Sequence, residues 1–383
     1  MPARRFLILV SDRLSEIVRK GEVVERFYNP GNLFRDVHIL LTNDDEPNPA
    51  TLQPMVGDAQ LHLHNLPSPS FRRTVGWQRP LLESWLAAGV RLAETIQPNL
   101  IRCYGLSLNA VLAAHIRRAT GIPSVVSLHG NPDVDYGRLA RTPVEKLTHW
   151  RLAQLQESAI QAFDHVIAVY SPIVPYCESR RLQSYSVIYN AVGVGARPKS
   201  DYRLVGGKLR CVCVGRQQSR EKDQRAILRA LAIAPNTELT LFGNGDLHDE
   251  LQRLSQELGI ASRVRFELGT PNHQLMQELC GFDVYVYNSI NFEISKTVIE
   301  AALIGLPIVL NERQPRLADE LQHDFILKVP DSPEGYAAGL SQLARDEQMR
   351  RRMGQEARAY ARSHWSPEAS EAKVAALYRQ FLA

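Results

Sequence analysis

The sequence predicts an α/β protein with two doubly wound domains, each consisting of a parallel sheet covered by helices. Short apolar runs alternate with helical patterns throughout the chain, which is typical of parallel sheets. With 383 residues, the chain exceeds what one hydrophobic core usually serves. The alternation restarts after a segment rich in Gly, Pro and charge at 191–207, which we interpret as a linker. We therefore expect one domain at 1–195 and another at 205–365.

The apolar runs of the first domain are expected to be its strands. Ligands of such sheets bind at the carboxyl ends of the strands, where the strand order reverses. The runs lie at 6–10, 37–41, 59–64, 100–104, 124–129, 165–169 and 185–189, and the helical patterns at 78–96, 107–119 and 143–162.

The second domain repeats this organisation. Its first predicted strand is LRCVCVG (209–215), and ELTLFG, RVRFEL, DVYVYN, LPIVLN and DFILKV follow between helices. The tail at 366–383 is predicted to be an amphipathic helix that packs back on the first domain. We expect its apolar stripe to consist of Ala372, Ala376, Leu377 and Phe381.

The composition favours a cytoplasmic protein. No apolar run approaches the ~18–20 residues of a membrane-spanning helix, and FLILV near the start is too short for a signal-peptide core. The five cysteines are odd in number and scattered, which argues against a disulfide framework. Cys211 and Cys213 have no second Cys or His pair at ligand spacing, so we expect no metal site.

The net charge of +4 is unevenly distributed. Residues 1–200 contain 22 Lys and Arg against 17 Asp and Glu, whereas the remainder contains 23 against 24. A mildly basic first half suits an anionic surface such as phospholipid headgroups, although most of these charges are expected to be simply solvated. The excess is too small to indicate nucleic-acid binding.

The segment FEISKTVIEAALIGLPIVLN (292–311) is predicted to be a short helix between two buried strands. The partial positive charge of a helix amino terminus normally attracts Asp or Glu. Here the first turn offers Ser295, Lys296 and Thr297 instead. Backbone N–H groups at a helix start, with a cation and hydroxyls, form an anion site that most often binds phosphate. The alternative is a solvated lysine on an ordinary helix.

Glu300 lies on the same predicted helix, which Gly305 and Pro307 are expected to end. Because the surrounding stretch is apolar, its carboxylate needs hydrogen-bond donors, and sugar hydroxyls could provide them. A nearby arginine is the alternative partner.

The segment VCVGRQQSREKDQ (212–224) is a strand followed by a basic loop with Arg216, Arg220 and Lys222. An arginine can bind two phosphate oxygens at once, and a lysine acts as a point charge. The sequence therefore indicates a second anion-binding element, with an ordinary basic surface loop as the alternative.

Gly243 and Gly245, in LTLFGNGDLHDELQRL (239–254), follow a strand and precede a helix. The third glycine of the dinucleotide-binding fingerprint is absent. Asp246, Asp249 and Glu250 would also repel a pyrophosphate at the start of that helix. We therefore interpret the pair as a tight turn with close backbone approach rather than as an oxidoreductase motif.

Two positions in the first half are weaker candidates. His129 lies at the carboxyl end of the predicted strand at 124–129, although a satisfied core histidine is the usual alternative. Gly21 lies in an early loop that could bring backbone N–H groups to the ligand.

Together these segments resemble the GT-B glycosyltransferases, in particular family 4 of the sequence classification. VCVGRQQSREK is similar to that family's Gly-Arg…Lys loop, and LTLFGNGDLHDELQRL to its Gly-x-Gly turn and helix. FEISKTVIEAALIGLPIVLN resembles its paired-glutamate motif, followed by Gly-x-Pro and a strand. In the first half, GIPSVVSLHG and FDHVIAVYSPIVPY…VIYNAV are similar to its His-Gly strand end and its final strand.

The resemblance implies a GT-B fold, with two Rossmann-like domains facing across a cleft. It implies transfer of a sugar from a nucleotide-sugar donor to an acceptor, with retention of configuration and without a metal or other cofactor. The acceptor is expected to be a glycan, a lipid-linked saccharide, a lipopolysaccharide or a small molecule. The basic first half adds the expectation of peripheral association with the inner face of the membrane.

The resemblance also assigns roles to residues. Arg216 and Lys222 would neutralise the donor diphosphate, and backbone N–H groups around Ser295–Thr297 would hold it. Glu300 would accept hydrogen bonds from the ribose. Glu293 would contact the transferred sugar, whereas His129, from the first domain, would lie near the sugar and the acceptor.

Two spacings depart from the family. Glu293 and Glu300 are one position closer together than usual, and Lys222 is one position farther from Arg216, so that Arg220 could replace either cation. Two alternatives therefore remain beside the transferase. One is a sugar-nucleotide 2-epimerase, which shares the architecture, and the other is a catalytically inactive donor-binding protein.

Overall fold

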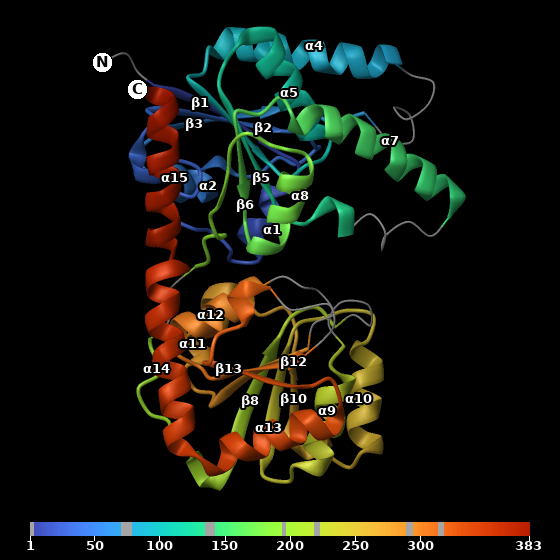
Figure 1. Ribbon diagram of the computed structural model, residues 1–383, viewed down its shortest axis with the longest axis vertical. Coiled ribbons are helices and arrows are strands. Elements are labelled where there is room, and N and C mark those ends of the chain that lie inside the picture. The colour runs from blue at the N-terminus through green and yellow to red at the C-terminus, as the bar shows by residue number, and fades with distance from the viewer. Residues whose placement is uncertain are drawn as a thin grey trace. The chain divides into compact units, whose positions relative to one another are not determined.

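The computed structural model describes residues 4–69, 79–134, 142–193, 197–217, 223–288, 294–312 and 318–383 (Figure 1). It confirms the predicted α/β class, because the chain forms two compact units that each contain a parallel sheet. Unit 1 consists of Met1–Arg19, Val23–Tyr189 and Ser370–Ala383, and unit 2 of Lys20–Glu22 and Asn190–Ala369.

The sheet of unit 1 has seven strands in the order β3-β2-β1-β4-β5-β6-β7. The order reverses between β1 and β4, so their carboxyl ends mark the ligand-binding edge of this unit. The strands are β1 (Arg5–Val10), β2 (Asp36–Leu41), β3 (Gln60–Asn65), β4 (Leu100–Tyr104), β5 (Ser124–Leu128), β6 (His165–Ala168) and β7 (Tyr185–Val187).

Three long helices of unit 1 pack together on one face of this sheet: α4 (Arg79–Ile96), α5 (Leu108–Thr120) and α7 (Pro143–Ile160). Gly89 permits close packing of α4 on α5, because a Cβ there would lie 2.5 Å from Leu112 Cδ1. Three short helices, α1 (Leu14–Arg19), α2 (Pro49–Val56) and α8 (Val174–Ser179), were not singled out by the sequence patterns.

The last helix, α15 (Pro367–Leu382), contributes Tyr378 to the core of unit 1. The Tyr378 ring packs edge-on against Phe6 at 5.3 Å, and Phe6 stacks on Phe34 at 4.2 Å. The predicted apolar stripe of this helix was partly wrong. Ala372 and Ala376 are exposed, whereas Ala375, Leu377 and Tyr378 are buried. Alanine residues contribute little to a hydrophobic pattern, so the sequence alone did not indicate which face of α15 packs inward. The contact of Tyr378 with Phe6 determines that face.

The sheet of unit 2 has six strands in the order β10-β9-β8-β11-β12-β13. This is again a doubly wound order, which reverses between β8 and β11. The strands are β8 (Leu209–Val214), β9 (Thr237–Phe242), β10 (Val264–Glu267), β11 (Val284–Tyr287), β12 (Ile308–Glu312) and β13 (Ile326–Pro330).

Helices cover both faces of this second sheet. The side chains of α9 (Arg225–Ile233), α10 (His248–Glu257) and α13 (Pro333–Arg345) share one apolar core with Cys211 and Cys213 of β8. The other group contains α11 (Asn272–Leu279), α12 (Lys296–Ile304) and α14 (Glu347–His364), which pack on one another. Gly354 permits the contact of α14 with α12, since a Cβ there would collide with the Gly305 carbonyl.

Candidate functional site

Helix α12 begins at the carboxyl end of β11, beside the point where the strand order of unit 2 reverses. Ser295 is its N-cap, and the Ser295 hydroxyl accepts a hydrogen bond from Val298 N–H at 3.3 Å. The Thr297 hydroxyl lies 2.9 Å from that of Ser295 and accepts from Tyr285 Oη at 2.7 Å. The two hydroxyls thus fix the shape of the turn, and the N–H groups of Lys296 and Thr297 precede the first intrahelical bonds.

Glu300 is buried one turn into α12, with 4% of its surface exposed. Asn272, the first residue of α11, donates from Nδ2 to Glu300 Oε1 at 2.8 Å. Glu300 Oε2 has no hydrogen-bond partner among the residues that the structure describes. Burial raises the pKa of this carboxyl to about 7, although Asn272 and the Lys296 charge both act to lower it. A buried carboxylate oxygen without a donor is costly, so this atom is suited to a ligand that brings one.

The early segment Lys20–Glu22 belongs to unit 2 and lies against the start of α11. Asn272 N–H donates to the Lys20 carbonyl at 2.9 Å. Gly21 has φ +69°, and a Cβ there would lie 3.1 Å from His273 Nδ1, so a side chain would be both strained and crowded. The Glu22 carboxylate forms an ion pair with Lys296 Nζ at 3.1 Å, in which both side chains are partly exposed. An anionic ligand at the start of α12 would therefore compete with Glu22 for Lys296.

Gly243 and Gly245 allow the loop after β9 to touch the loop after β8. A Cβ at Gly243 would collide with the Gly215 carbonyl, and one at Gly245 with the Gln217 carbonyl. Both glycines also have positive φ, 130° and 159°. The buried Gln217 side chain joins the loops by donating to the Gly243 carbonyl at 3.0 Å. The glycine pair is thus a site of close backbone approach at the ends of two neighbouring strands.

Arg216 lies just after the carboxyl end of β8, and its side chain is exposed. Gln224 Nε2 donates to the Arg216 carbonyl at 3.2 Å, which ties the loop to the start of α9. Lys222, Arg220 and Glu293, the other residues expected to act here, lie outside the described residues.

His129 follows β5 in unit 1 and has an exposed side chain. Its Nε2 lies 3.1 Å from Ser127 Oγ, and its carbonyl accepts a hydrogen bond from Tyr170 Oη. The His129 ring is 6.3 Å from that of Tyr104, the last residue of the neighbouring strand β4. The alternative of a buried core histidine is therefore wrong for this residue.

Sequence reasoning missed three residues that organise this site. Asn272 holds Glu300, Glu22 pairs with Lys296, and Gln217 joins the two loops. Asn272 and Glu22 are distant in sequence from their partners, so no local spacing could reveal them. Gln217 could have been noticed only as a polar residue directly after Arg216 in the loop that follows the predicted strand.

Within the described residues, every helix is too short or too polar to cross a bilayer.

Both halves of the chain match known families. Residues 199–360 match the family model of glycosyl transferases group 1, and residues 35–194 match that of Glycosyltransferase Family 4. A curated relative, the lipopolysaccharide core biosynthesis glycosyltransferase LpsE of Rhizobium meliloti, is 26% identical over 136 residues. The match covers 35% of this chain and 39% of that relative, which is less than half of its length.

Solved structures match over the whole chain. Sucrose-phosphate synthase from Thermosynechococcus elongatus superimposes with a TM-score of 0.74 at 16% identity, covering 99% of both chains. Anabaena HepE in complex with UDP gives a TM-score of 0.72 at 18% identity, covering 99% of this chain and 100% of that one. At these identities the likeness establishes the fold.

Proposed function

We propose that this chain, which belongs to the family 4 type of GT-B glycosyltransferases, transfers a sugar from a nucleotide-sugar donor to an acceptor with retention of configuration. The donor would bind to unit 2, at the ends of β8, β9 and β11.

One observation carries the proposal: Glu300 is buried at the start of a helix whose first turn contains a cation. Glu300 Oε2 needs a donor, and the two hydroxyls of a ribose would supply it. The helix start and Lys296 would hold the diphosphate of the same molecule. A nucleoside diphosphate thus satisfies both the carboxylate and the positive helix end, which a simple anion would not do.

The chemistry that follows is stabilisation of the leaving group. When the bond between the sugar and the phosphate breaks, negative charge develops on the diphosphate. Arg216 and Lys222 would oppose this charge from the loop after β8, and the start of α12 would do so from the other side. The departing phosphate can accept the proton of the acceptor hydroxyl, so no separate base is required. His129 of unit 1 and Glu293 would contact the sugar.

We propose that this stabilisation operates without a metal. Transfer should then continue at full rate in excess EDTA, because protein cations supply the counter-charge. Loss of transfer with EDTA and its recovery with Mg²⁺ would contradict this part of the proposal.

We propose a glycan or lipid-linked saccharide as the acceptor, at the cytoplasmic face of a membrane. The relative from Rhizobium meliloti is named for lipopolysaccharide core biosynthesis, which supports this class of acceptor. The basic balance of residues 1–200 is compatible with a peripheral position on an anionic surface.

The direct test is a thermal-shift panel of UDP-, GDP-, ADP- and TDP-sugars with the full chain. A donor at 100 times its Kd should stabilise the protein by about 2.7 kcal/mol, so the correct nucleotide should stand out. The selected donor is then assayed for sugar transfer to a lipid-linked acceptor extract. If no nucleotide sugar shifts the transition, the proposed donor site is wrong.

The same donor separates the alternatives. A 2-epimerase would convert the nucleotide sugar in the absence of any acceptor, whereas a transferase would leave its configuration at C2 unchanged. Binding without epimerisation and without transfer would indicate a donor-binding protein that has lost turnover.

A further inference from the structure

Helix α7 in unit 1 carries an exposed apolar pair that the packing of this unit leaves without a role. Trp150 and Leu147 are 54% and 58% exposed. On the opposite side, near the carboxyl end of α7, Ala159 and Ile160 are buried and Gln156 Nε2 donates to the Leu106 carbonyl. The helix therefore has apolar side chains on both faces, and only one face serves the core.

Two cations border this apolar pair. Successive residues of a helix lie about 100° apart, so Lys146 and Arg151 fall on either side of Trp150 and Leu147. Both cations are exposed, and the Arg151 guanidinium lies 5.4 Å from the centre of the Trp150 ring. We call these four residues, Lys146, Leu147, Trp150 and Arg151, the α7 patch.

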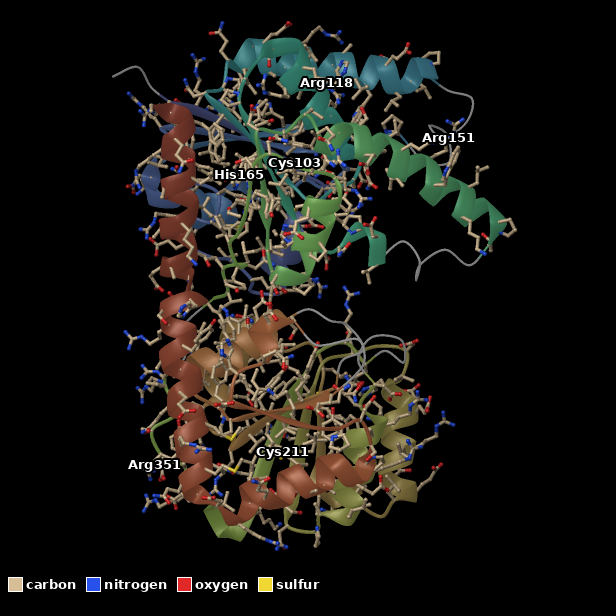
Figure 2. The ribbon with its side chains drawn as sticks, in the orientation of Figure 1. Cys103, Arg118, Arg151, His165, Cys211 and Arg351 are labelled. Atoms are coloured by element: carbon tan, nitrogen blue, oxygen red, sulfur yellow. The ribbon has the colours of Figure 1, made fainter. Side chains whose placement is uncertain are left out.

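The α7 patch lies on a helix that is firmly attached at its other end. Arg118, at the end of α5, donates to the Ser158 hydroxyl at 3.2 Å. Glu157, the acid next along this side of the helix, is paired with Arg180 at 3.0 Å. Figure 1 shows α7 extending outward from the sheet of unit 1, and Figure 2 labels Arg151 on the extending part and Arg118 near the sheet.

We propose that the α7 patch docks this protein on an anionic lipid surface, with Trp150 and Leu147 inserted at the headgroup level. A tryptophan has an apolar ring and a polar N–H, which suits the boundary between acyl chains and water. Lysine and arginine bury their aliphatic stems while their charges stay with the phosphates. An apolar centre bordered by cations is the pattern of helices that lie in a membrane interface.

The size of the patch favours lipid over a second copy of the chain. A stable protein–protein interface buries about 800 Å² on each partner, which two side chains cannot supply. A small insertion is enough for binding to a bilayer, because the attraction of Lys146 and Arg151 to anionic headgroups adds to it. This proposal deepens the peripheral position proposed above, and it does not depend on the transfer reaction.

The test is cosedimentation of the full chain with vesicles, in the absence of donor. Phosphatidylcholine vesicles with and without phosphatidylglycerol are compared for the wild type and for Leu147→Ser/Trp150→Ser. We expect strong binding only to the anionic vesicles, and at least tenfold weaker binding of the double variant. The matched control is Leu268→Ser in unit 2, where the leucine is 55% exposed, and it should bind like the wild type.

The charges are tested separately. Lys146→Gln and Arg151→Gln should each weaken binding to anionic vesicles about fivefold, and added salt should do the same to the wild type. Arg351→Gln on α14, which is 46% exposed, is the control and should have no effect. Equal binding to both kinds of vesicle would overturn the role of the cations.

Two further results would overturn the proposal as a whole. One is that the wild type binds to neither kind of vesicle, or that the double variant binds as strongly as the wild type. The other is self-association that the double variant abolishes in sedimentation equilibrium, because the patch would then join two copies. Donor-induced thermal shifts of each variant are measured in parallel. An unchanged shift shows that the variant is folded, and it keeps failure of the lipid proposal distinct from failure of the donor site.

Discussion

The two units share one strand order but differ in how their helices begin. The helix that follows the fourth strand of each sheet is α5 in unit 1 and α12 in unit 2. At the start of α5, Asn109 is fully buried, accepts from Ser107 Oγ at 2.6 Å and donates to the Tyr104 carbonyl at 2.7 Å. This turn satisfies its own polar groups. At the start of α12, Glu300 keeps one carboxylate oxygen without a donor among the described residues.

The loops after the first two strands differ in the same way. In unit 1, the Asn43 side chain bridges them by donating to the Ser11 and Asp12 carbonyls, both at 2.9 Å. In unit 2, the Gln217 side chain also joins the loops, but their backbones touch directly because Gly243 and Gly245 have no Cβ. The fold is thus common to both units, and the candidate site lies in unit 2, where Glu300 Oε2 has no donor among the described residues.

The largest expected effect concerns the cations in the loop after β8. We expect them to have a function that the cation in the loop after β1 of unit 1 lacks. Arg216→Ala and Lys222→Ala should each reduce transfer about 10²-fold, because each removes a charge that opposes the developing negative charge. The matched control is Arg13→Ala in the loop after β1, where Arg13 is paired with Asp44. Its transfer rate should stay within about twofold of the wild type. If Arg216→Ala and Lys222→Ala both transfer sugar from a proven donor at nearly the wild-type rate, the role proposed for the loop after β8 is wrong.

The next effect concerns the open helix start. Glu300→Gln should weaken donor binding about tenfold, since hydrogen bonds to a charged acceptor contribute more than those to a neutral one. Calorimetric titration of the donor measures this. The wild type should also bind more weakly as pH falls below about 7, the pKa of the Glu300 carboxyl, whereas the variant should show no such dependence. A pH-independent wild type would show that the ionised form of Glu300 is not required.

The same substitution should stabilise unit 2. Because the folded pKa of Glu300 exceeds its ordinary value of 4.5, folding is penalised as pH rises from about 4.5 to 7 and above. Glu300→Gln should therefore raise the free energy of unfolding of unit 2 by about 1–2 kcal/mol above pH 7. The chain has four tryptophans, so urea unfolding is followed by the fluorescence of Trp365, which lies in unit 2, in a protein whose other three tryptophans are replaced by phenylalanine.

The smallest effect is the opposite pH response of unit 1. His165 is 7% exposed, and burial together with the charge of Arg102 lowers its pKa to about 4. Because this pKa lies below the ordinary value of 6.5, the stability of unit 1 is complete above pH 6.5 and is lost as pH falls. We expect a loss of about 1 kcal/mol between pH 6.5 and 5.5. Urea unfolding should show a loss that is about 1 kcal/mol smaller in His165→Gln than in the wild type, because burial also lowers the pKa of His38 and of His64 in this unit and their share remains.

Most of the strands could be predicted because both sheets are buried on two faces. Their central strands are mainly apolar runs that end at glycine or polar residues, as in VCVGR at the end of β8, whereas the edge strands β3 and β10 alternate with polar residues. The start and the end of α12 could also be predicted, since Ser295 is an N-cap and Gly305 ends the helix in the left-handed conformation. These features are local, so neighbouring residues determine them.

The rest depends on contacts between distant parts of the chain. Nothing near Lys296 indicates that Glu22 is its counter-ion, and nothing near Glu300 indicates Asn272. The inward face of α15 depends on Phe6, which lies at the other end of the sequence. Sequence patterns identified the residues with unusual chemistry, whereas the fold supplied their partners.

The position of Tyr378 has a consequence for biosynthesis. Phe6 and Phe34 are made first, but the ring that packs against them belongs to the last helix. At a translation rate of about 5–20 residues per second, tens of seconds pass between the synthesis of these two rings and that of Tyr378. The amino-terminal unit therefore begins to fold first and becomes complete only after Tyr378 has been synthesised.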